Sequence, residues 1–490
     1  MNNRICLSRR RFLGFSLTAA ASGVLAACGS TAAPTSTSTP PTQPTIAPTN
    51  AASQEPAAAT EPAPTSAPAP TAAAAASGQA IKLEVWHENW GELYNDLMKL
   101  IGDEFTKANP DVELVWTFND DWREKWLTAV ASGLPPDCSF IRPWGVAPFA
   151  LQKAIAALDE YYAESGLKHE DFVTPGIASC LYEGKTYAIP GALDYDFLIY
   201  NNQVYRDAGL DPEKPPKTYA EWVEHSDKIY KFSAQGDIER MGMDPRADGL
   251  RKAGYMYGGS FYDEAAKKII CNKGGVVEAL SWMADNAKKW NPEKVAAFTT
   301  GMPSYYQPNS GFATGKQAYL YPGGSCWASD PLDKYAPDLD YGVTFPPTLK
   351  DDVAERAKYF WEGWNYGIPT GSKQPKLAWR FLKYAFYDQA ALMGVKTLNG
   401  CAVIAQLDLW CKGLSDALGA NNRMTPYLPI LVEGAKVGTK AWPTIPAAAR
   451  YTDEITRAED FAVHGAKTAQ QALDECAEIV QKELDDALKA

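Results

Sequence analysis

The sequence predicts an α/β fold with a parallel sheet, preceded by a long segment that does not belong to the folded body. Apolar residue types make up 46% of the 490 residues, which is enough to bury a sizeable core and is typical of two domains. From Ile81 onward, strand patterns alternate with helix patterns. That alternation is typical of a parallel sheet with helices on its faces.

Residues 1–27 have the pattern of an export signal. Three arginines, Arg9 to Arg11, precede an apolar run over residues 12–27, and this run is shorter than the roughly 20 residues that cross a bilayer. The stretch "SRRRFL" resembles the twin-arginine motif S-R-R-x-F-L, and a general secretory signal is also consistent with it. The stretch "LAAC" resembles a bacterial lipobox, which predicts lipidation of Cys28. An ordinary cleaved signal with a chance cysteine is the alternative.

Residues 28–79 are predicted to be the lipidated cysteine followed by a disordered tether. Residues 29–79 consist almost wholly of Ala, Thr, Pro and Ser, a composition that cannot bury enough apolar surface to fold. As a flexible coil, such a segment reaches roughly 40 Å. We therefore expect an extracytoplasmic body that is anchored to the bacterial membrane by an N-terminal lipid.

Charge and residue counts exclude some classes of function. Removal of residues 1–27, which carry four arginines and no acidic residue, changes the formal charge from −12 to −16. This balance argues against nucleic acid as a partner. The four histidines are scattered without metal-binding spacing, so no metal site and no cofactor are predicted. Seven cysteines remain after Cys28 and show no disulfide framework; Cys401 and Cys411 can bridge or stay thiols.

The order of elements from Ile81 supports the parallel sheet. Residues 81–87 alternate like a strand, and residues 94–110 follow with apolar residues at helical spacing up to Asn109-Pro110. Residues 111–118 form a second strand pattern, residues 122–133 a second helix pattern, and residues 137–143 a short third strand. Ligands of such sheets bind at the carboxyl ends of the strands. The loops "HENWG", "NDDW" and "RPWGV" are therefore the site candidates.

Five segments of the chain, in order, resemble a known family. They are "WLTAVASGLPPDCSF", "LQKAIAALDEYY", the stretch from "LYEGKTYAIPGALDYDF" to "KTYAEWVEHSDKI", "FATGKQAYLYPGGSCW", and "WNYGIPTGSKQPKLAWRFLKYAF". They resemble the extracellular solute-binding proteins of ATP-driven (ABC) importers, specifically the sugar-binding group that includes maltose-binding proteins. The resemblance runs from Ile81 to about Leu484.

The resemblance implies two α/β lobes with a ligand cleft between them, the type II-like periplasmic-binding-protein fold. Lobe 1 is expected at 80–192 plus 365–405, and lobe 2 at 193–362 plus 406–490, with crossings near 191–194 and 361–366. The family further implies a carbohydrate ligand, permease subunits of an importer as partners, a monomeric state and no enzymatic activity.

A sugar presents hydroxyls at its edge and C–H groups on its faces, which suit carboxylates, arginine and aromatic rings. The chain has 15 Trp and 25 Tyr, and several fall in the candidate loops. The predicted ligand-binding residues are Glu88, Trp90, Asp120, Arg142, Trp144, Asp194, Tyr195, Tyr257, Trp327, Trp361, Glu362, Trp364 and Arg450. Trp327, after two glycines, matches the stacking tryptophan of the family, and Asp194 matches its lobe crossing.

Each of these residues also has a structural interpretation. A tryptophan can be core packing, Asp194 a turn residue, and Glu88, Asp120, Arg142 or Glu362 a solvated charge. The arginine and prolines of "RPWGV" favour a ligand with an acidic group, or form only a rigid loop. Tyr257 and Arg450 rest on local matches of lower quality.

Three other functions stay open at this point. Paired carboxylates such as Glu88 and Asp120, or Asp194, with aromatic neighbours also build polysaccharide-acting enzymes. A binding protein for an oligopeptide, polyamine or metal has the same fold, and so has a tethered adhesion or sensor module without an importer.

Overall fold

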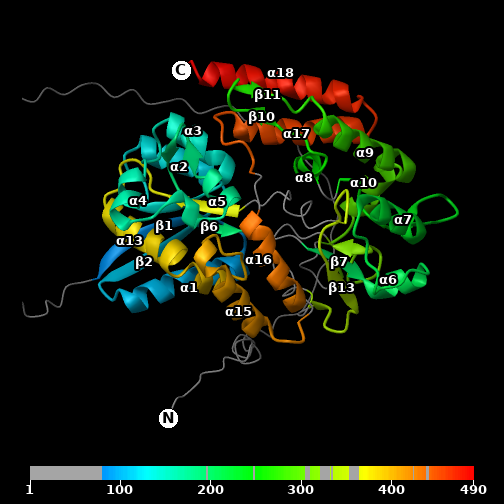
Figure 1. Cartoon of the computed structure of the whole chain (residues 1–490), viewed down its shortest axis with the longest axis horizontal. Helices are drawn as coiled ribbons and strands as arrows, with labels where there is room; N and C mark the ends of the chain where they lie inside the picture. Colours follow the sequence, from blue (N-terminus) through cyan, green and yellow to red (C-terminus); the bar gives the residue numbers. More distant parts are fainter. Residues whose placement is uncertain are drawn as a thin grey trace, which may run out of the picture. The chain divides into compact units, whose positions relative to one another are not determined.

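The computed structural model describes residues 80–489 except 195–196, 247–248, 304–308, 321–331, 333–334, 352–362, 423 and 438–440. Its larger sheet has five strands in the order β2-β1-β3-β14-β6; Figure 1 labels β1, β2 and β6 of this sheet. These strands are β1 (Ile81–Glu88), β2 (Val112–Asn119), β3 (Cys138–Ile141), β6 (Ile189–Leu193) and β14 (Gly363–Gly367). Strands β1, β2 and β3 are parallel, whereas β14 is antiparallel to both β3 and β6.

The expected alternation at the start of the folded body is confirmed. Helix α1 (Glu92–Ala108) connects β1 to β2, and α2 (Trp122–Ala131) connects β2 to β3. Leu83, Val85 and His87 alternate along β1 and are fully buried. The third strand is shorter than predicted, because Pro143 starts a turn of 3₁₀-helix, η2 (Pro143–Gly145), and has no N–H for the sheet.

Helices cover the larger sheet and continue its core. Helices α1 and α2 pack against β2, and α1 also packs against α14 (Ala390–Thr397). Helix α15 (Leu407–Leu418) packs on α14, and α16 (Leu428–Val437) packs on α15. The other elements of this part are α3 (Val146–Leu151), α4 (Asp159–Ser165), α5 (Thr174–Ala178), α13 (Pro375–Lys383), β4 (Leu181–Tyr182) and β5 (Lys185–Thr186).

A second sheet of three antiparallel strands has the order β12-β7-β13. Its strands are β7 (Leu198–Asn201), β12 (Tyr319–Leu320) and β13 (Tyr341–Thr344). The helices that accompany it are α6 (Asn202–Asp207), α7 (Tyr219–Ile229), α8 (Gly249–Met256), α9 (Gly275–Trp290) and α10 (Pro292–Thr300). Two short hairpins, β8 (Lys231–Phe232) with β9 (Ile238–Arg240) and β10 (Tyr262–Asp263) with β11 (Lys268–Ile269), complete this part.

The C-terminal helices α17 (Ala448–Val463) and α18 (Ala469–Ala487) pack against α9 and against each other. Their apolar faces share one buried cluster with α8, α9 and Trp442. Figure 1 shows α17 and α18 running alongside α8, α9 and the β10–β11 hairpin.

The chain passes between the two sheets at two adjacent points. Strand β6 of the larger sheet is followed by β7 of the smaller one, and β14 returns the chain to the larger sheet. Gly363 at the start of β14 pairs with Leu193 at the end of β6. A Cβ at Gly363 would lie 2.0 Å from the Ala192 carbonyl oxygen, so only glycine permits this approach. The exact lobe boundaries stay a prediction.

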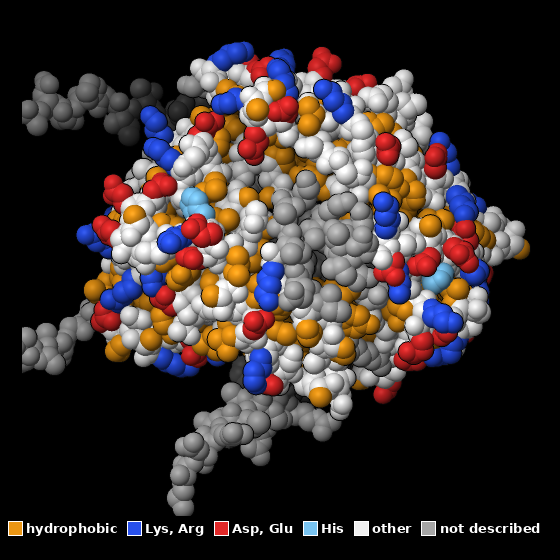
Figure 2. Space-filling view, viewed as in Figure 1, with side chains coloured by type: hydrophobic (Ala, Val, Ile, Leu, Met, Phe, Trp, Pro, Cys, Tyr) orange, Lys and Arg blue, Asp and Glu red, His pale blue; other side chains and the backbone are white. Residues whose placement is uncertain are grey.

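Charged side chains of both signs alternate over the face shown in Figure 2. Of the cysteines that the structure describes, Cys138, Cys180, Cys271, Cys401 and Cys476 are buried, and Cys411 is half-buried. In the described ranges, no helix combines the length and the apolar composition that a membrane crossing needs.

Candidate functional site

The carboxyl ends of the three parallel strands bring charged residues to one edge of the sheet. Glu88 ends β1, Asp120 follows β2, and Arg142 follows β3. Arg142 Nε donates a 2.8 Å hydrogen bond to Glu88 Oε2, and Asn89 Nδ2 donates a 2.7 Å hydrogen bond to Asp120 Oδ1. The three loops that the sequence singled out therefore meet and are joined by side-chain contacts.

Asn89 holds the first of these loops in place. Its Oδ1 accepts hydrogen bonds from Gly91 N at 3.1 Å and from Asn95 Nδ2 at 2.7 Å, while Nδ2 reaches Asp120. Gly91 has a φ of 92°, which is strained for residues with a side chain. One amide thus fixes the turn from β1 into α1 and the position of the Asp120 carboxylate.

An aromatic layer lies beneath the charged edge. The buried His87 ring lies 4.6 Å from the Trp90 ring and 4.7 Å from the Phe140 ring. The Arg142 guanidinium lies over the Trp90 ring at 5.2 Å, a cation–π contact. Burial lowers the pKa of His87 to about 3, so this imidazole is neutral at physiological pH and contributes no charge to the site.

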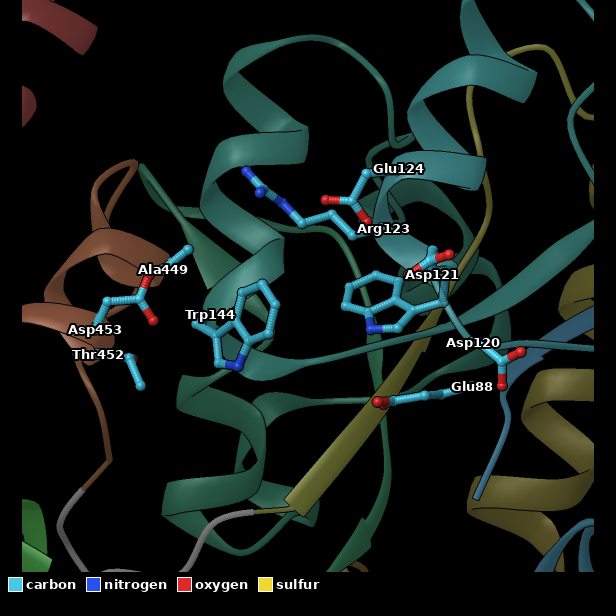
Figure 3. Close-up of a pocket in the computed structure, with 10 residues that line it drawn as sticks. Glu88, Asp120, Asp121, Arg123, Glu124, Trp144, Ala449, Thr452 and Asp453 are labelled. Carbon is cyan, nitrogen blue, oxygen red and sulfur yellow. The ribbon is translucent and has the colours of Figure 1, made fainter. Parts of the chain in front are cut away.

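A pocket of about 350 Å³ opens at this edge, a size in the range of small-ligand sites. It is lined by Glu88, Asp120, Asp121, Trp122, Arg123, Glu124, Trp144, Ala449, Thr452 and Asp453. Figure 3 shows Trp144 between the residues at the strand ends and the side chains of Ala449, Thr452 and Asp453, which come from α17. The pocket therefore has one wall from the larger sheet and one from the C-terminal helices.

Carboxylates dominate the pocket. Five acidic residues and one arginine line it, and the neighbouring Arg142 is paired with Glu88. Arg123 Nε is buried without a hydrogen-bond acceptor among the described residues. The site thus offers many acceptors, the unpaired Nε–H of Arg123 and a negative charge, and it can accept hydrogen bonds from a neutral or cationic ligand.

The sequence-predicted residues fall into three groups, and the first lies at the pocket. Glu88, Asp120 and Trp144 line it, and Arg142 contacts Glu88 at its margin. The predicted tryptophans Trp90 and Trp364 instead belong to the aromatic layer around His87. Trp364 is only 3% exposed, so its packing corresponds to the structural interpretation that the sequence left open.

The second group, Asp194, Tyr257 and Arg450, is not among the lining residues. Asp194 follows β6 at the crossing. The pKa of Tyr94 is raised mainly by the burial of its hydroxyl and, to a smaller extent, by the negative charge of Asp194. Arg450 on α17 pairs at 2.8 Å with the buried carboxylate of Glu454, which also binds Arg457 Nε at 3.0 Å.

Tyr257, at the end of α8, stacks on Tyr219 with ring centroids 6.2 Å apart. Burial raises the pKa of Tyr257 to about 12, so the side chain stays a neutral hydroxyl. Like Asp194 and Arg450, it is placed by contacts within the protein.

The third group, Tyr195, Trp327, Trp361 and Glu362, lies outside the described residues. So do Cys28 and the export and tether segments that precede the folded body. Their predicted roles stay predictions.

Sequence reasoning missed Trp122, Arg123 and Glu124 at the start of α2 and the three lining residues of α17. Trp122 and Asp121 stood within the quoted loop "NDDW", where the alternation of strand and helix already placed a site. The α17 residues stood within "PAAARYTDEI", from which only Arg450 was selected. The sequence could point to this segment but not to the individual residues, because the packing of α17 decides which of its side chains face the pocket.

Among the residues that the structure describes, no group of three or more His, Cys, Asp or Glu side chains is arranged to hold a metal ion.

Residues 88–391 match the model of the family described as bacterial extracellular solute-binding protein. The chain belongs to this family. The matched residues include the strand ends at the pocket, from Glu88 to Trp144, but not α17. Members of this family are binding proteins rather than enzymes, and the family is extracellular.

Among curated relatives of this solute-binding protein is the sn-glycerol-3-phosphate-binding periplasmic protein UgpB of Escherichia coli O6:K15:H31. It is 29% identical over 170 residues, which cover 33% of this chain and 38% of UgpB. UgpB of Pectobacterium atrosepticum is 27% identical over 157 residues, or 31% of this chain and 35% of that protein. The solute-binding protein thus spans a little over a third of the length of these relatives.

Solved structures resemble the solute-binding protein over most of its length. CpMnBP1 with mannobiose bound has a TM-score of 0.66 and 25% identity, covering 82% of this chain and 100% of that one. MalE of Xanthomonas citri has a TM-score of 0.65 and 18% identity, covering 83% and 98%. The two-lobed α/β fold of maltose-binding proteins, which the sequence predicted, is confirmed.

Proposed function

We propose that this chain captures a neutral carbohydrate, a mono- or oligosaccharide, outside the cytoplasm and delivers it unchanged to the permease of an ABC importer. The observation that carries the proposal is the pocket at the carboxyl ends of β1, β2 and β3, where carboxylates alternate with Trp122 and Trp144. Sugar hydroxyls donate hydrogen bonds to carboxylates, and the C–H face of a sugar ring packs on an indole.

The charge of the pocket narrows the ligand class. A phosphate or carboxylate on the ligand would meet Asp120, Asp121, Glu124 and Asp453, and only Arg123 among the lining residues would attract it. The positive charge of Arg142 is already offset by Glu88. We therefore place neutral sugars before uronic acids and other acidic ligands.

The comparisons offer two candidate solutes. CpMnBP1, at 25% identity, was solved with mannobiose bound, and a neutral disaccharide fits the proposed pocket. UgpB, as named, binds sn-glycerol 3-phosphate, which is anionic and fits an acidic pocket poorly. Mannobiose is therefore the first probe, and glycerol 3-phosphate is the second candidate to be tested.

Further residues complete the proposed binding site. Trp327, Trp361, Glu362 and Tyr195 are proposed as contacts that would come from the part of the chain beyond the described pocket wall. Asp194 would reach the ligand from the crossing, and Tyr257 and Arg450 remain candidates whose present contacts are with Tyr219 and Glu454.

The protein would act close to its importer. Lipidation of Cys28 would fix the mature chain to the membrane, and residues 29–79 would let a monomeric body reach the permease subunits. Two acyl chains or more are needed for firm attachment, because one chain binds a bilayer only marginally. Whether export uses the twin-arginine or the general route does not change this function.

Isothermal titration of the detergent-solubilised protein with a panel of neutral oligosaccharides, beginning with mannobiose, tests the proposal. Saturable binding of one sugar per chain, with the sugar recovered intact by chromatography, is expected. Release of shortened products would show an enzyme instead. Tight binding of glycerol 3-phosphate without binding of any sugar would replace carbohydrate by the second candidate.

A further inference from the structure

We propose that Cys271 and Cys476 form a disulfide bond in the exported protein. Cys271 follows β11, and Cys476 lies on α18, 205 residues further along the chain. Their sulfur atoms are 3.9 Å apart. A disulfide requires the sulfurs to approach to about 2 Å, which is a short movement of two side chains that already face each other.

Hydrogen bonds on both sides of the cysteine pair fix its register. On one side, Gln481 Oε1 of α18 accepts from Ile269 N at 2.9 Å, and its Nε2 donates to Lys267 O at 3.2 Å. On the other side, Asn272 Nδ2 donates to Asp474 Oδ1 at 2.8 Å. Hydrogen bonds to α18 therefore hold residues 267–272 both before and after Cys271. The two thiols cannot separate without breaking these bonds.

The surroundings of the pair are apolar and closed. Cys271 and Cys476 are both buried within the cluster formed by α8, α9, α17 and α18. An oxidant cannot reach them in the folded protein, so the bond would form while α18 docks during folding outside the cytoplasm. Cys138, Cys180 and Cys401 are equally buried, so burial alone does not single out the Cys271–Cys476 pair, whereas the contact between its two sulfur atoms does.

The chemistry is a thiol–disulfide exchange with an external disulfide, of low molecular weight or on an oxidoreductase. The contact with Cys476 lowers the pKa of the Cys271 thiol, so Cys271 is the readier nucleophile. Its thiolate attacks one sulfur of the oxidant, and the displaced thiolate takes up a proton. The Cys476 sulfur then loses its proton and attacks the Cys271 sulfur, which releases the second thiol. Two electrons pass from the cysteines to the oxidant.

The bond would stabilise the position of α17, which forms one wall of the pocket. Helix α18 packs along α17, and α17 carries Thr452 and Asp453 into the pocket. A cross-link between the β10–β11 hairpin and α18 closes a loop of about 205 residues. The longer the closed loop, the more conformational entropy the unfolded chain loses, and the more the folded state is stabilised. The inference needs the extracytoplasmic location and export of the unfolded chain, by the general secretory route, but it does not depend on which solute is bound.

Peptide mapping of the exported full chain tests the proposal. The protein is denatured without reductant, free thiols are blocked with an alkylating reagent, and the digest is analysed by mass spectrometry. We expect the Cys271 and Cys476 peptides to be joined in most molecules, with Cys138, Cys180 and Cys401 alkylated. Alkylation of both Cys271 and Cys476, or joining of either to a different cysteine, overturns the proposal.

Thermal unfolding gives an independent readout. Reductant should lower the Tm of the wild-type protein by a few degrees, because loop closure is lost. Reductant should not change the Tm of Cys476→Ala, whereas Cys401→Ala, the matched control, should keep the wild-type response. A Tm of the wild-type protein that is insensitive to a reductant shown by mapping to reach every cysteine would contradict a stabilising bond.

Discussion

Arg142 Nε donates a 2.8 Å hydrogen bond to Glu88 Oε2, while the same guanidinium covers the Trp90 ring at 5.2 Å. The pair links the ends of β1 and β3 and leaves both side chains partly exposed. Its consequence is electrostatic: the only arginine at the end of β3 is neutralised, so the negative charge of the neighbouring carboxylates decides what the pocket accepts.

Substitution Glu88→Gln should weaken binding of a neutral sugar roughly tenfold, because one charged acceptor is lost and the Arg142 charge is no longer offset. The same change should improve the relative affinity for an anionic solute. Isothermal titration with mannobiose and glycerol 3-phosphate measures both. Glu84→Gln, on the same strand with its carboxylate bound to Trp86, is the control. An unchanged preference would show that the ion pair does not set the charge of the site.

Trp144→Ala should weaken sugar binding by on the order of 1–3 kcal/mol, because the indole would stack on the sugar face. Trp144→Phe should retain part of that affinity. Trp144 also packs against two buried clusters, so unfolding is followed by circular dichroism alongside the titration. Trp86→Ala, a partly exposed tryptophan outside the lining residues, is the control. Equal affinity of wild type and a folded Trp144→Ala variant would make Trp144 a packing residue.

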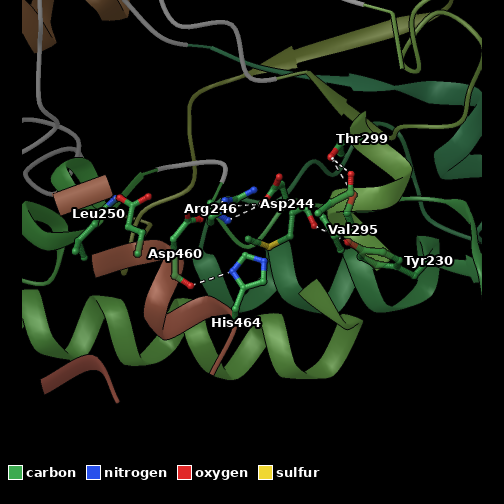
Figure 4. Close-up of polar contacts among 11 residues, drawn as sticks. Tyr230, Asp244, Arg246, Leu250, Val295, Thr299, Asp460 and His464 are labelled. Carbon is green, nitrogen blue, oxygen red and sulfur yellow. Dashed lines mark hydrogen bonds and ion pairs between the residues drawn. The ribbon is translucent and has the colours of Figure 1, made fainter. Parts of the chain in front are cut away.

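Glu459 on α17 gives the fold a defined pH response. The Leu250 N–H donates to Glu459 Oε1 at 2.5 Å, and burial raises the pKa of this carboxyl to about 7 from an ordinary value of 4.5. Next to it, Arg246 Nη1 donates to Asp460 Oδ1 at 2.9 Å (Figure 4). Because the folded state keeps a proton that the unfolded state releases, the stability contributed by Glu459 is present below pH 4.5 and is lost as the pH rises to 7.

Glu459→Gln should remove this dependence, since the amide keeps an oxygen for Leu250 N and does not titrate. The free energy of unfolding of the variant should increase relative to that of the wild type as the pH rises from 4.5 to 7, by at most about 3 kcal/mol. Denaturant unfolding at a series of pH values measures the difference, and Glu478→Gln on the exposed face of α18 is the control for charge removal. A constant difference across this range would show that Glu459 is ionised in the folded protein.

Local patterns predicted the first part of the fold and the place of the site. Alternation along β1 and helical spacing along α1 follow from side-chain periodicity, and the meeting of Glu88, Asp120 and Arg142 follows from parallel strands sharing one edge. The sequence could not separate Trp144, which lines the pocket, from Trp90, which packs on His87. That difference depends on side-chain direction after each strand ends.

The second wall of the pocket, formed by α17, could not be predicted from the sequence because it depends on tertiary packing. Thr452 and Asp453 are ordinary residues of an amphipathic helix until α17 docks beside η2, where Trp144 lies. Likewise, Cys271 and Cys476 show no spacing that connects them, because residues 205 apart meet only through the docking of α18. Long-range contacts of this kind leave no local pattern in one sequence.

Cys28→Ser should release the protein from the membrane into the medium or the soluble extracytoplasmic fraction, because the lipid acceptor is lost. Immunoblotting of membrane and soluble fractions measures the distribution. Cys6→Ser, within the segment expected to be removed, is the matched control and should stay with the membrane. Retention of Cys28→Ser at the membrane would refute lipidation at this residue.

The most direct test of the account is whether the pocket between the strand ends and α17 binds sugar. Titration of wild type and of Trp144→Ala/Asp453→Ala with mannobiose, or with the neutral oligosaccharide that binds tightest in the panel, compares the two walls at once. Asp486→Asn on α18 is the control. We expect one saturable site in the wild type and in the control, and a loss of affinity of at least about 100-fold in the folded double variant. Equal affinity of the double variant and the wild type would place the sugar elsewhere and contradict the account.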